Sequence, residues 1–110
     1  MKSILEELVG LRITGAEIVV DYLQVVFENG TRLSVYNKHQ ITTSDGLPES
    51  EQAMVGSVLS AVDESKAVIK FTFSNLLALA VDRTEDGYLG PEAMELNRPG
   101  MPTVVWRADD

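Results

Sequence analysis

The chain has 110 residues, and its 45% hydrophobic and 24% charged residues are proportions of a globular domain rather than of a disordered segment. This length suits one domain and leaves no room for a second core. Seventeen acidic against nine basic residues give a formal net charge of −8, which disfavours nucleic acid and anionic lipid as direct partners. The absence of cysteine excludes disulfides, thiol nucleophiles and thiolate metal sites. Because no stretch resembles a signal peptide or a membrane span, we expect a cytoplasmic protein.

The expected order of elements begins with a short helix. Ser3 and Glu6 have the spacing of a capping box, in which the serine hydroxyl and the glutamate each bond a free backbone amide. Gly10 is a natural end for this helix. The segment from Leu11 to Val20 then predicts a strand that bends near Gly15.

A β-hairpin is expected next. Leu23–Phe27 and Thr31–Tyr36 alternate apolar and polar residues as strands do, and Leu33 and Val35 share one face. Asn29-Gly30 stands between the two strands, and both residues tolerate the positive φ angles of a type I′ turn.

An internal repeat with an offset of 46 residues relates this first part of the chain to a second part. Segments 9–36 and 55–82 share six identities without a gap, which are Val9–Val55, Gly10–Gly56, Phe27–Phe73, Asn29–Asn75, Leu33–Leu79 and Val35–Val81. We interpret the pattern as two pseudo-repeats of one helix-strand-hairpin unit, at about 3–36 and 49–82. Two similar β-patterns that arose by chance are the alternative.

The repeat resolves an ambiguity at Glu49 to Val62, which by itself could form one long helix. The match between Gly56 and Gly10 instead favours a short helix from about Pro48 to Val55, followed by a strand from Ser57 to Asp63. The second hairpin is then expected at 67–73 and 76–81. Because Asn75-Leu76 replaces Asn29-Gly30, we expect its turn to be built differently.

Three segments lie outside the repeat. Lys38 to Leu47 predicts a polar connecting loop, and Asp82 to Pro91 predicts a longer one. Glu92–Leu96 and Thr103–Trp106 predict a C-terminal hairpin. The expected fold class is α+β within one domain, with about eight strands in mainly antiparallel sheet and two short helices.

Residues that could carry out a chemical reaction are scarce. His39 is the only histidine, and no glycine-rich phosphate loop is present. The segment Asp82 to Gly87 imitates the start of a calcium loop, but Ala93 occupies the twelfth position, where an EF-hand requires glutamate. Adjacent carboxylates are so frequent in this chain that no pair stands out as an acid–base site. We therefore expect neither an enzyme nor a metal or cofactor site.

Acidic and aromatic residues that suit protein contacts gather in two groups. The first group is Asp82, Glu85, Asp86, Tyr88 and Glu92, and the second is Asp45, Glu49 and Glu51. Carboxylates pair with a partner's arginines, and tyrosine is enriched at binding hot spots. Each group is a candidate partner-binding site, and ordinary solvated surface loops are the alternative. Trp106 is more typical of a core residue than of a contact residue.

The overall pattern resembles small bacterial immunity proteins of contact-dependent growth inhibition and related polymorphic toxin systems. The segment Leu23 to Val35 carries the resemblance, and Gly90-Pro91-Glu92-Ala93-Met94 and Val104-Val105-Trp106 add to it. The resemblance implies a stoichiometric inhibitor, or antitoxin, that binds and neutralises a basic toxin domain, often a nuclease. The alternative is a small regulatory or ligand-binding domain, whereas an enzyme would need a site built from carboxylates alone.

Overall fold

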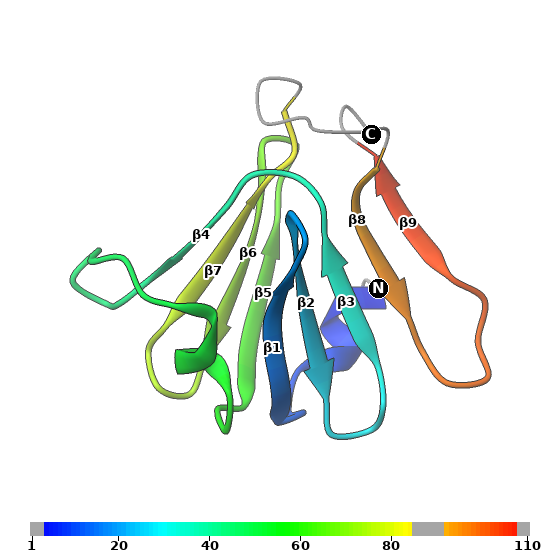
Figure 1. Cartoon of the computed structure of the whole chain (residues 1–110), viewed down its shortest axis with the longest axis horizontal. Helices are drawn as coiled ribbons and strands as arrows, with labels where there is room; N and C mark the ends of the chain where they lie inside the picture. Colours follow the sequence, from blue (N-terminus) through cyan, green and yellow to red (C-terminus); the bar gives the residue numbers. More distant parts are fainter. Residues whose placement is uncertain (1–3, 85–91, 108–110) are drawn as a thin grey trace.

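The computed structural model describes residues 4–84 and 92–107, in which nine strands form two antiparallel sheets (Figure 1). The five-stranded sheet has the order β1 (Ile13–Val19), β2 (Tyr22–Phe27), β3 (Arg32–Val35), β8 (Glu92–Asn97) and β9 (Val104–Arg107). The four-stranded sheet has the order β4 (His39–Thr42), β7 (Ala78–Asp82), β6 (Val68–Phe73) and β5 (Leu59–Glu64). The expected mainly antiparallel β-structure is confirmed.

One hydrophobic core lies between the two sheets. Strands β2, β6 and β7 alternate buried and more exposed side chains, because successive residues of a strand point to opposite faces. Phe27 of the five-stranded sheet and Phe71 of the four-stranded sheet are among the largest fully buried side chains. Burial of such a side chain contributes roughly 1.5–3 kcal/mol, so these alternating strands supply much of the stabilisation.

The expected α+β class with two short helices is not confirmed, because the described residues have 3₁₀ helices at the two expected places, η1 (Ile4–Leu8) and η2 (Glu51–Met54). Both are short, and both end just before a glycine of positive φ, at Gly10 and Gly56. A segment this short cannot repay the cost of nucleating an α-helix, whereas 3₁₀ turns are common in short pieces. Pro48 does not start a helix but forms a β-bridge with Thr42. Ser3 of the expected capping box lies outside the described residues.

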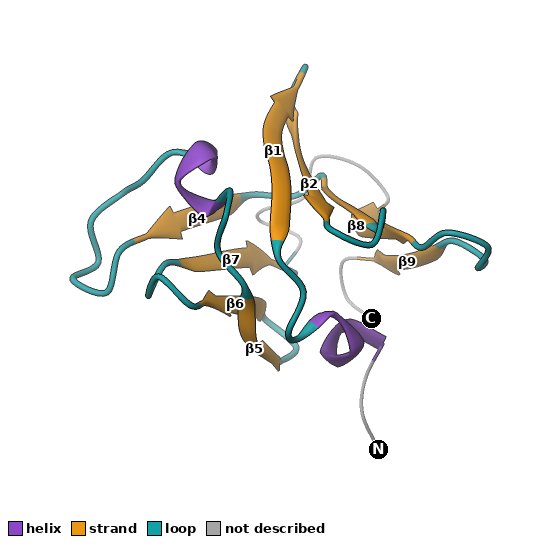
Figure 2. Cartoon of the chain, turned by 90° about the horizontal axis from the view of Figure 1, so that it is seen from below, coloured by secondary structure: helices purple, strands orange, loops and turns teal. Residues whose placement is uncertain are grey.

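The two halves have matching elements at the offset of 46 residues. The ladder between β1 and β2 has a bulge between Ile13 and Gly15, and the ladder between β5 and β6 has one between Leu59 and Ala61. Each 3₁₀ helix packs on the first strand of the other half, η1 on β5 and η2 on β1 (Figure 2).

The junction between the halves follows the same symmetry. The N–H of Gly10 donates to the Leu59 carbonyl at 2.8 Å, and the N–H of Gly56 donates to the Ile13 carbonyl at 2.8 Å. A bridge between Arg12 and Val58 lies between these bonds and joins the edges of β1 and β5. The halves are therefore related by a pseudo-two-fold arrangement that links the two sheets.

The expectation that the second hairpin turn is built differently is wrong. Leu76 has a φ of 69°, close to the 87° of Gly30. The Oδ1 atom of Asn29 accepts a hydrogen bond from the N–H of Thr31 at 3.1 Å, and that of Asn75 accepts one from the N–H of Leu77 at 3.3 Å. The shared asparagine thus builds the same turn in both halves, and Leu76 adopts a conformation that favours glycine.

The loop predicted at 38–47 contains a strand, β4, which brings the number of strands to nine. Of its four residues only Ile41 is buried. The segment His39–Thr42 therefore lacks the alternation of apolar and polar residues that indicates a strand. The strand that follows each half pairs with the hairpin of the other half. Strand β4 follows the first half and pairs with β7, and β8 follows the second half and pairs with β3.

A candidate partner-binding trough

A trough runs over the face of the four-stranded sheet that points away from the core. It consists of two adjoining hollows of about 750 and 470 Å³, which both border Val68 and Ala80. The larger hollow reaches Asp21 in the β1–β2 turn and the segment from Asn37 to Gln40, and the smaller one reaches Leu76. The trough therefore combines groups from both sheets.

Small side chains on β7 explain why the trough lies on this sheet. At the offset of 46 residues, Ala78 and Ala80 correspond to Arg32 and Ser34 of the five-stranded sheet. The alanines lie beside Thr72 and Lys70 of β6. Because their side chains are small, the surface of the sheet is recessed in the middle. A comparison of the two halves in the sequence would have revealed this loss of side-chain volume.

The equivalent face of the five-stranded sheet carries large side chains. The rings of Tyr22 and Tyr36 lie with their centroids 5.1 Å apart, and the Tyr36 hydroxyl donates to Oε2 of Glu95 at 2.6 Å. Burial, followed by this hydrogen bond, raises the pKa of Tyr36 to about 12. At the positions of Tyr22 and Tyr36 the trough has Val68 and Asp82.

Two exposed apolar residues adopt strained backbone conformations, one bordering the trough and one next to the trough residue Asp21. Leu76 borders the smaller hollow, has a φ of 69° and is 66% exposed. Val20 precedes Asp21, has a φ of 59° and is 93% exposed. Positive φ is unusual for bulky and β-branched residues, and such strain occurs preferentially at functional sites. The expectations from sequence did not include either residue, although the Asn75-Leu76 mismatch pointed to one of them.

Asp82 lies in the trough, but its carboxylate is held by its own segment. Oδ1 of Asp82 accepts hydrogen bonds from the N–H of Thr84 at 2.7 Å and from its hydroxyl at 2.6 Å. These two bonds lower the pKa of the Asp82 carboxyl group. The Asp82 carbonyl in turn accepts a bond of 2.6 Å from Nδ2 of Asn37. The main role of Asp82 in this structure is thus to fix the end of β7 through these hydrogen bonds.

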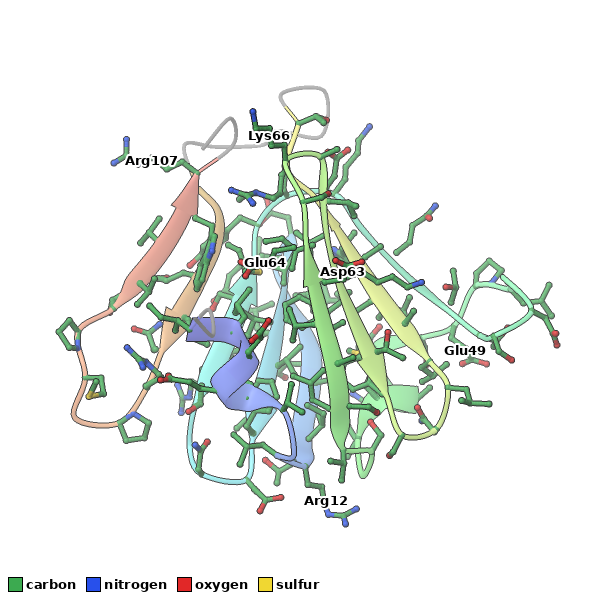
Figure 3. All side chains as sticks on the ribbon, turned by 180° about the vertical axis from the view of Figure 1, so that it is seen from behind. Arg12, Glu49, Asp63, Glu64, Lys66 and Arg107 are labelled. Carbon is green, nitrogen blue, oxygen red and sulfur yellow. The ribbon has the colours of Figure 1, made fainter. Side chains whose placement is uncertain are left out.

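A third hollow of about 340 Å³ lies along β4 and is bordered by Glu49 and Glu51. His39 and Gln40 border both this hollow and the trough, so β4 separates the two. Figure 3 shows Glu49 on the loop beyond β4, far from Asp63 and Glu64 of β5. We call Glu49, Glu51 and β4 the acidic rim of the trough.

The structure therefore brings together part of the predicted contact set. Asp82 lies in the trough and Glu49 in the acidic rim, whereas Asp45 is exposed in the loop between them. Glu92 belongs to β8 of the other sheet. Three further predicted contact residues lie outside the described residues, and they are Glu85, Asp86 and Tyr88. Trp106 is half-buried on β9 and packs against the core.

Residues 4–84 and 92–107 contain no group of three or more His, Cys, Asp or Glu side chains that could hold a metal ion. Within the same ranges, no helix combines the length and the apolar character needed to cross a membrane. Comparisons with protein-family models, with curated proteins and with solved structures found no match for this chain.

Proposed function

We propose that this protein binds a basic protein partner through the trough and its acidic rim, and that it neutralises that partner as an immunity protein neutralises a toxin domain. The observation that carries the proposal is Leu76, a 66% exposed leucine in a left-handed conformation at the edge of the trough. The candidate partner is a basic toxin domain such as a nuclease.

Leu76 has no evident role in folding. A left-handed conformation costs a residue with a side chain roughly 1–2 kcal/mol, and burial of about a third of this side chain recovers only about 0.5–1 kcal/mol of that. Glycine occupies the equivalent place in the first hairpin, so the turn does not need a leucine. An exposed apolar side chain beside a trough floored by alanines is suited to insertion into a partner, and it would act there as a contact anchor.

The carboxylates around the trough supply the charge that a basic partner requires. Within the part of the chain that the structure describes, Asp21, Glu49 and Glu51 form no ion pair. An exposed ion pair contributes only about 0–1 kcal/mol, so these groups act mainly by steering the partner toward the surface. Affinity then depends on the apolar contacts of Leu76, Val68 and Val20.

The decisive experiment is reconstitution with a candidate partner. The chain is expressed with the products of neighbouring genes, and a basic toxin domain that copurifies is tested for a one-to-one complex and for loss of its activity. The association rate should fall as salt is added, because screening weakens the steering. A one-to-one complex whose activity is unchanged would contradict the neutralising role.

Matched variants test the surface. Glu49→Gln with Glu51→Gln should slow association with the partner, whereas Asp63→Asn with Glu64→Gln changes the charge equally on β5 and should not. Asp63 and Glu64 lie on β5, whereas Glu49 lies in the loop that covers β4, the opposite edge strand of the four-stranded sheet. Three strand spacings, about 14 Å in all, separate β4 from β5. Equal association rates for both double variants would place the contact elsewhere.

A small-molecule site is the second candidate, and one observation favours it. The larger hollow, at about 750 Å³, falls within the range of ligand pockets. At its border, Oδ1 of Asn37 is buried and has no hydrogen-bond partner among residues 4–84 and 92–107. A ligand for this site would raise the unfolding temperature in a screen of metabolites, and Asn37→Ala would abolish that rise.

A further inference from the structure

The edges of β1 and β5 close each other where the two strands begin, and the rest of β5 carries the charged residues Asp63 and Glu64. Apart from the bonds made by Gly10 and Gly56, the N–H of Ile13 donates to the Ser57 carbonyl at 2.8 Å, and the N–H of Leu59 donates to the Leu11 carbonyl at 2.9 Å. Further along β1, Nε2 of Gln52 donates to the carbonyl of Ala16 at 2.5 Å. These bonds satisfy backbone groups that an edge strand would otherwise present to another chain.

The edge of β4 is covered by the loop that follows it. The N–H of Glu49 donates to the Ile41 carbonyl at 2.8 Å, and Pro48 forms a bridge with Thr42. Proline at this point has no N–H to offer to a further strand. The loop thus occupies the pairing edge of β4.

Within the described residues, no such bond or bridge closes the free edge of β9. Among the described elements β9 pairs with β8 alone, and Figures 1 and 3 both show it at the margin of the molecule. Its sequence, Val104-Val105-Trp106-Arg107, contains no proline and no charge before its last residue. Proline, lysine and inward charges are the usual protection of an edge strand. Its side chains Val104 and Trp106 pack against the core but remain only half-buried.

We propose that β9 pairs with β9 of a second copy of this chain, in antiparallel orientation and with the two Val105 residues opposite each other. This register joins two five-stranded sheets into one continuous sheet. It places Trp106 of each copy beside Val104 of the other, because residues at equal distances from a two-fold axis face each other in an antiparallel pair. The rows Met94–Trp106 and Leu96–Val104 within one copy then continue across the interface.

The self-pairing of β9 is favoured by its own pattern. On the face toward the core, the pairing covers half-buried apolar groups with apolar groups, which a polar strand from another protein would not do. On the other face Val105, which is 40% exposed, meets its own copy. Because the strand has only four residues and each chain carries a charge of −8, association should be weak, with a dissociation constant of roughly 10–100 μM.

The pairing goes beyond the proposed function and is independent of it. Strands β4 and β9 lie at opposite margins of the molecule, so a β9 dimer leaves both acidic rims free (Figure 1). The two contacts also respond oppositely to salt. Added salt should strengthen the dimer by screening the repulsion between two acidic chains, whereas it should slow the binding of a basic partner.

Sedimentation equilibrium of the full chain tests the dimer. The average mass should rise with concentration from 12.1 kDa toward twice that value. Val105→Lys opposes two like charges at the centre of the pairing and should leave a monomer. Met101→Lys is the matched control, because Met101 is 53% exposed outside the strand, and it should dimerise like the parent chain. A monomer mass for the parent at all concentrations up to about 1 mM would overturn the proposal.

A cysteine variant tests the register and does not depend on the effect of a charge. Directly opposed residues in an antiparallel pair have Cα atoms about 4.5–5.5 Å apart, within the range of a disulfide. The natural chain has no cysteine, so Val105→Cys should form a disulfide-linked dimer under mild oxidation at least about tenfold faster than Met101→Cys. Equal rates for the two variants would refute the β9 pairing.

Discussion

Replacement of Leu76 by glycine tests whether this residue is strained, and Leu47→Gly is its control. Both leucines are largely exposed, at 66% and 61%, but only Leu76 has a positive φ. In each case glycine increases the conformational entropy of the unfolded chain, which costs about 0.4–1 kcal/mol. Each replacement also removes roughly a third of the burial of a leucine, worth about 0.5–1 kcal/mol.

The two variants differ in the energy of the backbone conformation at the substituted residue. Leu76→Gly relieves a left-handed conformation worth roughly 1–2 kcal/mol, which offsets the other two losses. We therefore expect Leu76→Gly to leave the free energy of unfolding almost unchanged and Leu47→Gly to lower it by about 1–2 kcal/mol. For a chain of this size, a difference of 1–2 kcal/mol corresponds to about 4–9 °C in Tm.

Urea titration and differential scanning calorimetry of both variants provide the measurement. The reverse replacement, Gly30→Leu, should lower stability, because a Cβ at Gly30 lies 3.2 Å from Cγ of Pro99 and the backbone keeps a φ of 87°. An equal loss of stability in Leu76→Gly and Leu47→Gly would refute the strain at Leu76. Under the proposed function, Leu76→Gly should weaken partner binding while stability stays unchanged.

Two further predictions concern hydrogen-bonded polar side chains, Tyr36 and Asn37. Because burial and the bond to Glu95 raise the pKa of Tyr36 from 10.0 to about 12, its contribution to stability is complete below pH 10 and is lost as pH rises through 12. Tyr36→Phe should reduce that alkaline loss, and an unchanged dependence of urea midpoints on pH would contradict it. Asn37→Asp replaces the N–H donor that bonds the Asp82 carbonyl with a buried carboxylate, and should destabilise the fold by about 2–3 kcal/mol at neutral pH. Thermal unfolding measures this change, and a loss below about 1 kcal/mol would show that the Asn37 bond is unimportant.

Local signals determined the hairpins. Asn29-Gly30, flanked by alternating apolar residues, predicts β2 and β3 to within one residue at each end. The repeat carries the same interpretation to β6 and β7, and their register follows that of the first hairpin. These features are visible in the sequence because a tight turn and the alternation of side chains are both decided by neighbouring residues.

Other features depend on contacts between distant residues. Strand β4 has little strand character of its own, and it forms because β7 offers an edge to it. The trough exists because alanines of β7 lie beside small or flexible side chains of neighbouring strands, a juxtaposition that follows from sheet order. The sequence alone therefore determined which segments alternate, turn and enter the core. Tertiary structure decided which edges pair, since backbone groups are the same in every strand and only the fold selects their partners.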